Sequence, residues 1–340
     1  MDTVTLGRTG ITVSKNGFGA LPIQRISKAD ACRLLRTAYD GGITWFDTAH
    51  FYTDSEEKIG AALSDVRDKI ILSTKTMCQS AAQFNEELDT SLRSMKTDYI
   101  DVYQFHNLPV CPKPGDGSGL YEAMLEAKAA GKIRFIGLTN HRLGVAEEAI
   151  RSGLYDTIQF PFCYLSGEKE LALVRLAKEQ NVGFLAMKAL SGGLITNSAA
   201  AYAFLAQFDN VLPLWGVQRD RELAEFLAYQ TNPPRLTDEL RAVIEEDRKA
   251  LAGDFCRGCG YCMPCPAGIR INDCARMTLM LRRAPVAGYT TPQWKEEMEK
   301  IESCLHCGKC ASKCPYGLDT PTLLRRNLDD FRAFVREHNI

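Results

Sequence analysis

The sequence predicts an α/β fold, a closed (β/α)8 barrel with an amino-terminal β-hairpin, followed by a small, mainly helical domain. Short apolar runs alternate with amphipathic helical stretches through roughly the first 230 residues, which is typical of parallel strands covered by helices. Beyond that point, eight of the thirteen cysteines lie in two tight groups. A doubly wound open sheet is the alternative. It is disfavoured because no GxGxxG motif opens a helix after a strand.

The expected elements follow one another in order. Residues 3–14 alternate around Gly7-Arg8-Thr9-Gly10, which predicts a β-hairpin. Eight strands are then expected at residues 16–23, 43–47, 70–75, 99–106, 135–139, 157–160, 183–187 and 211–214. Eight helices are expected at residues 28–39, 55–63, 81–95, 120–130, 143–151, 168–180, 198–207 and 219–228.

A proline pair marks the expected domain boundary. Asn232-Pro233-Pro234 interrupts the alternation, so we expect the barrel at residues 1–234 and the second domain at residues 235–340. The second domain should begin with a helix over residues 236–251 and contain another over residues 293–302. Its last helix should open at Thr320-Pro321, with Thr320 as the N-cap and Pro321 in the first turn.

Composition excludes several classes of partner. The net charge is −1 and there is no long basic run, so no nucleic-acid partner is expected. No apolar run approaches about 18 residues and the amino terminus lacks the features of a signal peptide, so no membrane partner is expected. The chain is too long and its cysteines too unevenly placed for a disulfide scaffold. A reducing cytoplasm is therefore the expected location.

Polar side chains end three consecutive predicted strands. The apolar run from Ile43 ends on Asp47, the next strand ends on Lys75 and the one after it on His106, while Tyr52 follows in the first loop. The carboxyl ends of barrel strands meet at one face, where active sites lie. Any one of these residues alone could simply cap the barrel rim. All four in this order favour a catalytic group.

The motifs FDTAxxYxxSEEKIG, STK and YQFHN resemble those of the aldo-keto reductases. The resemblance implies a catalytic tetrad of Asp47, Tyr52, Lys75 and His106, and a small-molecule carbonyl or alcohol as substrate. A tyrosine hydroxyl has an ordinary pKa of about 10, and a neighbouring cation lowers it. Lys75 would supply this cation, Asp47 would hold Lys75, and His106 would donate a hydrogen bond to the substrate oxygen. A structural salt bridge at the barrel mouth is the alternative for the Lys75–Asp47 pair.

The same resemblance implies a nicotinamide cofactor, NADP(H) or NAD(H). Its carboxamide would meet Thr139, Asn140 and Gln159, although these side chains could equally order their loops. Its phosphates would meet backbone N–H groups after the last two strands. Met187 stands where the family usually stacks an aromatic ring, and Gln218-Arg219 replaces a basic-then-hydroxyl pair. The remaining candidate residues for cofactor binding are Ser191, Gly192, Gly216 and Arg219.

The two cysteine runs favour two [4Fe-4S] clusters. In each run two residues separate each of the first three cysteines from the next, and the run ends on Cys-Pro. In two-cluster ferredoxins the fourth cysteine of each run binds the other cluster. The first run is one residue shorter before its last cysteine, and two structural zinc sites are the alternative. The crosswise rule predicts one group of Cys256, Cys259, Cys262 and Cys314 and another of Cys304, Cys307, Cys310 and Cys265.

The whole chain resembles the aldo-keto reductase branch that carries a carboxyl-terminal ferredoxin-like dicluster domain. The leading prediction is an oxidoreductase that interconverts a carbonyl and an alcohol, with electron relay through the clusters. A nicotinamide moves two electrons as hydride, whereas each cluster moves one. Either the clusters are structural or regulatory, or the barrel holds a flavin, or the substrate is reduced in single steps. The exposed side of the second domain, which carries Lys309, Lys313, Arg325 and Arg326, could dock an acidic ferredoxin. The alternative is a redox-sensing or electron-transfer protein whose barrel binds a nucleotide without reducing a carbonyl.

Overall fold

The computed structural model describes residues 2–251, 255–283, 286–338 and 340. The chain forms two compact units. The first comprises Met1–Leu190 with Asn197–Ile244, and the second comprises Ser191–Thr196 with Glu245–Ile340. Each unit has a hydrophobic core of its own.

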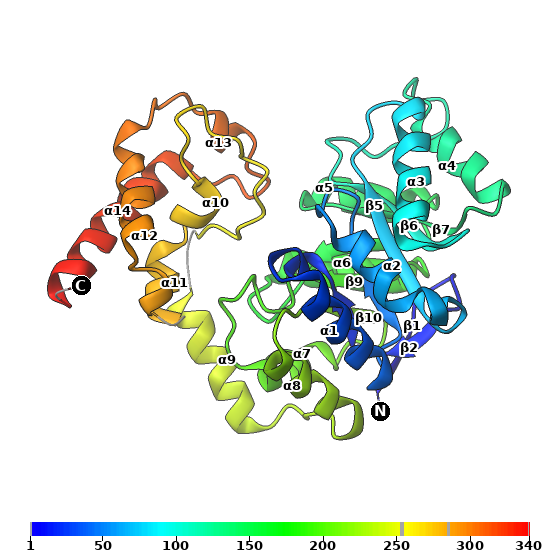
Figure 1. Cartoon of the computed structure of the whole chain (residues 1–340), viewed down its shortest axis with the longest axis horizontal. Helices are drawn as coiled ribbons and strands as arrows, with labels where there is room; N and C mark the ends of the chain where they lie inside the picture. Colours follow the sequence, from blue (N-terminus) through cyan, green and yellow to red (C-terminus); the bar gives the residue numbers. More distant parts are fainter. Residues whose placement is uncertain (1, 252–254, 284–285, 339) are drawn as a thin grey trace. The chain divides into compact units, whose positions relative to one another are not determined.

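The first unit is a closed barrel of eight parallel strands surrounded by helices (Figure 1). The strands neighbour one another in the order β10-β3-β4-β5-β6-β7-β8-β9. Their bounds are β3 Gly17–Gly19, β4 Trp45–Asp47, β5 Ile71–Thr76, β6 Ile100–His106, β7 Ile133–Thr139, β8 Thr157–Pro161, β9 Gly183–Met187 and β10 Val211–Gly216. The predicted fold class is confirmed.

The helices of this unit agree with the sequence prediction to within a few residues. They are α1 Lys28–Asp40, α2 Ser55–Leu63, α3 Ala81–Met95, α4 Leu120–Ala129, α5 Leu143–Ser152, α6 Glu168–Glu179, α7 Ser198–Leu205 and α8 Asp220–Thr231, with 3-10 helices η1 Leu21–Arg25 and η2 Ser64–Lys69. The first strand is shorter than expected and passes into η1. Pro22 cannot donate a ladder hydrogen bond, which helps to end the strand there.

The predicted amino-terminal hairpin is present and closes one end of the barrel. Strands β1 (Thr3–Thr5) and β2 (Thr12–Ser14) are antiparallel, and the turn between them uses glycines with positive φ. Gly7 forms a bridge with Val182, which directly precedes β9. The hairpin therefore lies at the amino-terminal ends of the strands. Its buried side chains share a core with residues of the strands, comprising Val4, Leu6, Val13, Trp45, Val102, Leu185, Leu212 and Leu214.

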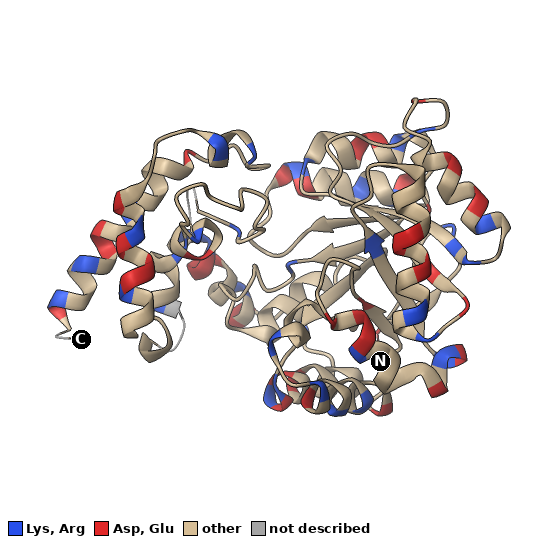
Figure 2. Cartoon of the chain, turned by 45° about the horizontal axis from the view of Figure 1, so that its top comes forward, with Lys and Arg blue, Asp and Glu red and all other residues tan. Residues whose placement is uncertain are grey.

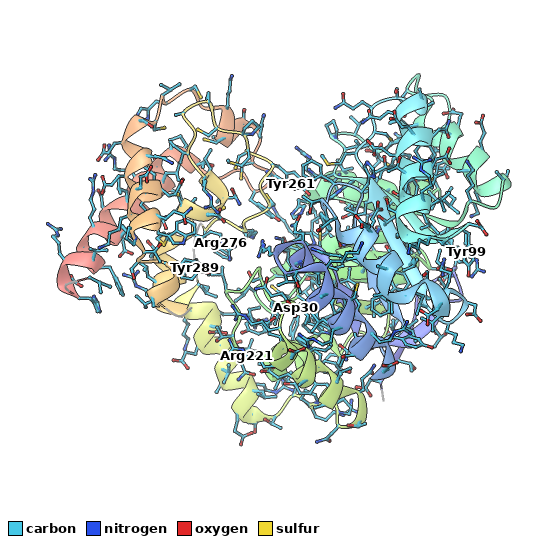
Figure 3. All side chains as sticks on the ribbon, in the orientation of Figure 1. Asp30, Tyr99, Arg221, Tyr261, Arg276 and Tyr289 are labelled. Carbon is cyan, nitrogen blue, oxygen red and sulfur yellow. The ribbon has the colours of Figure 1, made fainter. Side chains whose placement is uncertain are left out.

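An ion-pair cluster fastens the same end of the barrel. Asp101, the second residue of β6, is fully buried and accepts hydrogen bonds from Arg67 at 2.7 Å and from the backbone N–H of Leu72 at 2.9 Å. Arg134 of β7 reaches its other oxygen at 3.0 Å. The guanidinium carbons of Arg67 and Arg134 lie 3.9 and 4.2 Å from the ring centroid of Tyr99, which Figure 3 labels. These contacts join η2, β6 and β7.

The second unit is mainly helical. Its helices pack around α14, where Leu324, Leu328 and Phe331 meet Met298 and Ile301. The predicted last helix is confirmed, but its N-cap is Asp319 rather than Thr320, because the Asp319 side chain accepts from the N–H of Thr322. The helices after the barrel are α9 Asp238–Ala250, α10 Ile271–Cys274, α11 Met277–Arg283, η3 Val286–Gly288, α12 Pro292–Glu299, η4 Lys300–Ser303, α13 Lys309–Ser312 and α14 Thr320–Glu337.

Charges of both signs alternate along the outer helices of each unit (Figure 2). Across the described residues, we find no helix with the length and apolar character needed to cross a membrane.

Candidate active site and cluster-binding cysteines

Three adjacent strands and one loop supply the predicted tetrad. Asp47 is the last residue of β4, Lys75 lies near the end of β5 and His106 is the last residue of β6. Tyr52 lies in the loop between β4 and α2. Because β4, β5 and β6 are neighbours in a parallel barrel, the four residues lie at its carboxyl-terminal face.

A buried ion pair forms the base of this group. Lys75 Nζ lies 2.7 Å from Asp47 Oδ2, and the two residues are 1% and 4% exposed. Lys75 also donates to the carbonyl oxygen of Thr48, and Ser73 Oγ donates to Asp47 Oδ1 at 3.0 Å. Burial lowers the pKa of Lys75, and the negative charge of Asp47 opposes that change. Asp47 therefore both fixes the ammonium group and favours its charged form.

Tyr52 lies between this ammonium group and His106. Lys75 Nζ is 5.5 Å from the centroid of the Tyr52 ring, and the rings of Tyr52 and His106 meet edge to face with centroids 5.9 Å apart. Burial, followed by the charge of Lys75, lowers the pKa of His106 to about 3. The imidazole is therefore neutral near pH 7. It can donate one hydrogen bond to a substrate oxygen without carrying a charge of its own.

A layer of amide and hydroxyl groups supports the ion pair from inside the barrel. Gln104 Nε2 donates to Ser73 Oγ at 2.9 Å and to Gln159 Oε1 at 2.8 Å. Gln159 Nε2 in turn donates to Asp47 Oδ2 at 3.3 Å. Sequence reasoning missed Ser73 and Gln104. Each lies two residues before a tetrad member on the same strand, so the period-two alternation of a strand was the available signal.

Thr139, Asn140 and Met187 lie at the same face, but the Asn140 side chain already has partners. Its Nδ2 donates to the carbonyl of Leu108 at 2.8 Å, and its Oδ1 accepts from the N–H groups of His141 and Arg142, both at 2.9 Å. All three partners are backbone groups of nearby loops, so these contacts favour a role for Asn140 in ordering the loops. Thr139 Oγ1, at the end of β7, lies 3.8 Å from the sulfur of Met187 at the end of β9.

The structure assigns Ser191 and Gly192 to a different unit from the other phosphate candidates. Both lie in the segment Ser191–Thr196, which groups with the second unit, and the Gly192 carbonyl accepts from Arg276 Nη2 at 2.7 Å. Arg276 is labelled in Figure 3. The predicted group of phosphate contacts is therefore divided between the two units.

Gly216 and Arg219 remain with the barrel, at the end of β10 and at the N-cap of α8. The backbone N–H groups of Gln218 and Arg219 donate to Glu222 Oε2 at 3.0 and 3.1 Å. The Glu222 carboxylate thus accepts hydrogen bonds from backbone N–H groups that we had expected, from the sequence, to bind a cofactor phosphate. A phosphate would meet a like charge there.

The eight cysteines of the two runs lie in the second unit. Cys307 is exposed, Cys310 is buried and the other six are half-buried. One small cavity is lined by Cys304, Cys307 and Cys310 together with Cys265 of the first run, and also by Cys262. Burial, and then the neighbouring Cys259 and Cys314 thiols, raise the pKa of Cys256. Cys256 and Cys314 pack against the same hydrophobic cluster of this unit.

The two cysteine runs resemble the ligand pattern of two-cluster ferredoxins, because each run ends on Cys-Pro and two residues separate each of its first three cysteines from the next. Which cysteines bind which cluster stays a prediction.

Comparison with known proteins agrees with this architecture. Residues 15–226 match the Aldo/keto reductase family, and residues 255–319 match a 4Fe-4S dicluster domain. The first match covers more than half of the chain, so the protein belongs to the aldo/keto reductase family. It carries a 4Fe-4S dicluster domain after the barrel. The family resemblance inferred from the sequence is confirmed.

Among curated relatives, the chain is 32% identical over 216 residues to Aldo-keto reductase YhdN of Bacillus subtilis and 30% identical over 211 residues to L-galactose dehydrogenase of Arabidopsis thaliana. These matches cover 58% and 56% of this chain but 64% and 66% of those proteins. The chain thus spans somewhat less than two thirds of their lengths.

Among solved structures, the holo form of aldo-keto reductase AKR11C1 from Bacillus halodurans superposes with a TM-score of 0.65 at 24% identity, over 75% of this chain and 98% of that one. An aldo-keto reductase from Klebsiella pneumoniae in complex with NADPH gives a TM-score of 0.62 at 22% identity, over 72% and 94% of the two chains. At sequence identities of 22% and 24%, these two structures show only that the chains share a fold. Neither family match and neither of these two structures supports a flavin.

Proposed function

We propose that this protein interconverts a carbonyl and an alcohol on a small molecule, with Tyr52 as the proton donor. The observation that carries the proposal is the buried pair of Lys75 and Asp47, with Lys75 Nζ 5.5 Å from the Tyr52 ring centroid. A cation at this position favours the phenolate and so makes the tyrosine hydroxyl a stronger acid. His106, neutral and buried, lies at the edge of the same ring.

In the proposed reaction a bound nicotinamide supplies hydride to the carbonyl carbon. Tyr52 donates a proton to the oxygen that gains negative charge, and His106 donates a hydrogen bond to the same oxygen. Lys75 remains protonated and stabilises the resulting phenolate. Asp47 holds Lys75 and offsets the cost of burying its charge.

We propose NADP(H) or NAD(H) as the cofactor, as family membership suggests. The proposed contacts are Gln159 and Thr139 at the barrel mouth, and Gly216 and Arg219 after β10. Asn140 would act mainly by ordering the loop from His141, because its amide already makes three hydrogen bonds. Met187 completes the proposed set within the barrel, whereas Ser191 and Gly192 belong to the second unit and stay predictions from the sequence. Glu222 at the start of α8 disfavours an additional phosphate there and so weighs toward NAD(H).

We further propose that the eight cysteines bind two [4Fe-4S] clusters that relay electrons singly. The cavity that Cys265 lines together with Cys304, Cys307 and Cys310 favours the crosswise sets, although Cys262 of the first run lines it too. We propose a reducing cytoplasm as the location, because such a compartment keeps cysteine thiols reduced and able to bind a cluster.

An acidic one-electron carrier such as a ferredoxin is the proposed partner. Leu305, next to Cys304, is 65% exposed, and Cys307, Lys309 and Lys313 are exposed around it. An apolar side chain among cations beside a cluster ligand suits a small, transient interface with an acidic protein. Arg325, also on this unit, is already paired with Glu302 at 2.8 Å.

The alternative function is redox sensing or electron transfer, with the barrel as a nucleotide-binding scaffold. Two observations favour it. Met187 takes the place of a stacking aromatic ring, and Glu222 fills the N–H groups at the start of α8. One experiment separates the two functions. Anaerobically purified protein is assayed for reduction of a panel of aldehydes and ketones with NADH, NADPH and reduced viologen, beside Tyr52→Phe.

A carbonyl reductase loses about 100- to 10,000-fold in turnover in Tyr52→Phe while its iron content and circular dichroism stay unchanged. A native protein that binds nucleotide and exchanges electrons with viologen, yet reduces none of the carbonyls, would instead support the alternative.

A further inference from the structure

Three basic side chains outside the tetrad lie at the carboxyl-terminal face of the barrel. His141 and Arg142 follow β7, and Lys188 follows β9. The register of β6 and β7 sets His106 opposite Thr139, two residues before His141. Thr139 Oγ1 also lies 3.8 Å from the sulfur of Met187, the residue before Lys188. These contacts bring the ends of β6, β7 and β9 together.

The His141 side chain lies among the charges of this group. It is 5% exposed, and its pKa falls well below the usual value because of burial, and then because of Lys188, His106 and Arg142. The charge that accumulates here is positive. The carboxylate of Asp47, the tetrad's own anion, already accepts hydrogen bonds from Lys75, Ser73 and Gln159.

Two buried nitrogen atoms, one in this group and one in the neighbouring His106, have no hydrogen-bond partner among the described residues. Arg142 Nη1 and His106 Nδ1 are both inaccessible to solvent, and neither has a hydrogen-bond partner within the described part of the chain. Buried polar groups in folded proteins are almost always paired, so an unpaired guanidinium nitrogen points to an absent partner. The partner that suits a guanidinium is an anionic oxygen.

The backbone at Lys188 supports the same conclusion. Its φ is +57°, in the left-handed region that residues other than glycine rarely adopt. Such conformations persist where the surrounding structure holds them, and they cluster at ligand sites.

We propose that Arg142 and Lys188 bind an anionic oxygen group, a carboxylate or a phosphate, of a ligand that is seated at His106. Arg142 would grip the group through parallel N–H bonds, and Lys188 would add a point charge. The placement of the ligand at His106 rests on the proposed function. Two ligands could supply this anionic oxygen group, and both would present the same chemistry to Arg142 and Lys188. It is the substrate's own acid group, as in an oxo acid or a phosphorylated carbonyl compound, or it is the diphosphate of the nucleotide.

Binding is tested first without turnover, on the anaerobically purified full chain. Inorganic phosphate is titrated by calorimetry into the native protein, Arg142→Gln, Lys188→Gln and the control Lys69→Gln. Lys69 is exposed in η2, just before β5 at the opposite end of the barrel. Each site variant should weaken phosphate binding roughly 10-fold or more, as loss of a charge-assisted hydrogen bond does, and Lys69→Gln should bind like the native protein. Equal affinities in all four proteins would overturn the proposal.

Two further measurements identify the source of the anion. Nucleotide dissociation constants, followed by fluorescence, rise in the site variants if the cofactor supplies it. If the substrate supplies it, the KM rises for carbonyl compounds that carry a carboxylate or a phosphate, stays constant for neutral ones, and nucleotide binding is unchanged. Arg142→Lys should recover part of the lost affinity.

Phosphate binding that depends on both residues, in a protein that reduces no carbonyl, would support the site while contradicting the proposed function. In a protein that does reduce carbonyls, unchanged nucleotide affinity and unchanged KM values in both variants would overturn the proposal, because the anion would then belong neither to the cofactor nor to the substrate at His106.

Discussion

Gln159 Nε2 donates a hydrogen bond to Asp47 Oδ2 across the interior of the barrel, at 3.3 Å. Asp47 is on β4 and Gln159 is on β8, and these strands lie four places apart in a ring of eight. The bond therefore joins opposite walls of the barrel. Through Gln159 and Gln104, the proposed cofactor side of the site is tied to the ion pair that positions Lys75.

Asp47→Asn should lower turnover about 100- to 10,000-fold, because the buried Lys75 would lose the charge that favours its protonated form and Tyr52 would become a weaker acid. Ser73→Ala is the matched control, since it removes one hydrogen bond to Asp47 but no charge. It should cost far less. Rates are measured on anaerobic protein of equal iron content. Equal losses in the two variants would assign the effect to packing rather than charge.

Acidification should destabilise the barrel through His106. Its pKa is about 3 in the folded protein and near 6.5 when unfolded, so the unfolded chain binds more protons between these values and stability falls as the pH drops below about 6.5. Through His106 alone, the free energy of unfolding should fall by on the order of 2 kcal/mol between pH 6.5 and pH 5.

The test compares His106→Gln with the exposed His338→Gln, following unfolding by Trp45 and Trp215 fluorescence in a Trp294→Phe background. His106→Gln should lose less stability than the parent protein over this pH range. A parallel pH dependence in both variants would show that other groups are responsible.

Asp101→Ala should destabilise the barrel by about 3–5 kcal/mol, because it leaves the half-buried Arg67 without its partner. Arg134→Gln removes the more exposed member of the same cluster, whose side chain is 54% exposed, and should cost at most about 1 kcal/mol. Both are measured by urea unfolding. The turnover of folded enzyme should not change, because this cluster lies at the amino-terminal ends of the strands. A loss of turnover at full stability would contradict that separation.

Paired substitutions test the crosswise cluster ligands. Cys265→Ala alone should reduce bound iron from about eight to about four atoms per chain, since it opens one cluster. Adding Cys307→Ala should remove no more iron, because both residues serve the same cluster. Adding Cys259→Ala should remove the remainder. Iron and sulfide are assayed anaerobically, with electron paramagnetic resonance of the reduced protein, and the opposite pattern would show that each run binds its own cluster.

Much of this protein could be predicted from its sequence, because the information is local. Alternation of apolar strands with amphipathic helices predicted a closed barrel. The strand-ending residues Asp47, Lys75 and His106 predicted an active face, since parallel strands bring their carboxyl ends together. The two cysteine runs predicted a dicluster domain, because ligand spacing reflects the size of a cluster.

The tertiary structure decided which side chains pair with one another. Gln104 and Ser73 join the ion pair only when the barrel closes. The amide of Asn140 is committed to its own loop. Glu222 folds back onto the N–H groups expected to meet a phosphate. Some of these partners are far apart along the chain, and others compete for the same hydrogen-bond donor. Which pairs form depends on distances that are set only when the chain folds. The sequence determined which groups this protein carries, whereas the fold determined which of them remain available to bind a ligand.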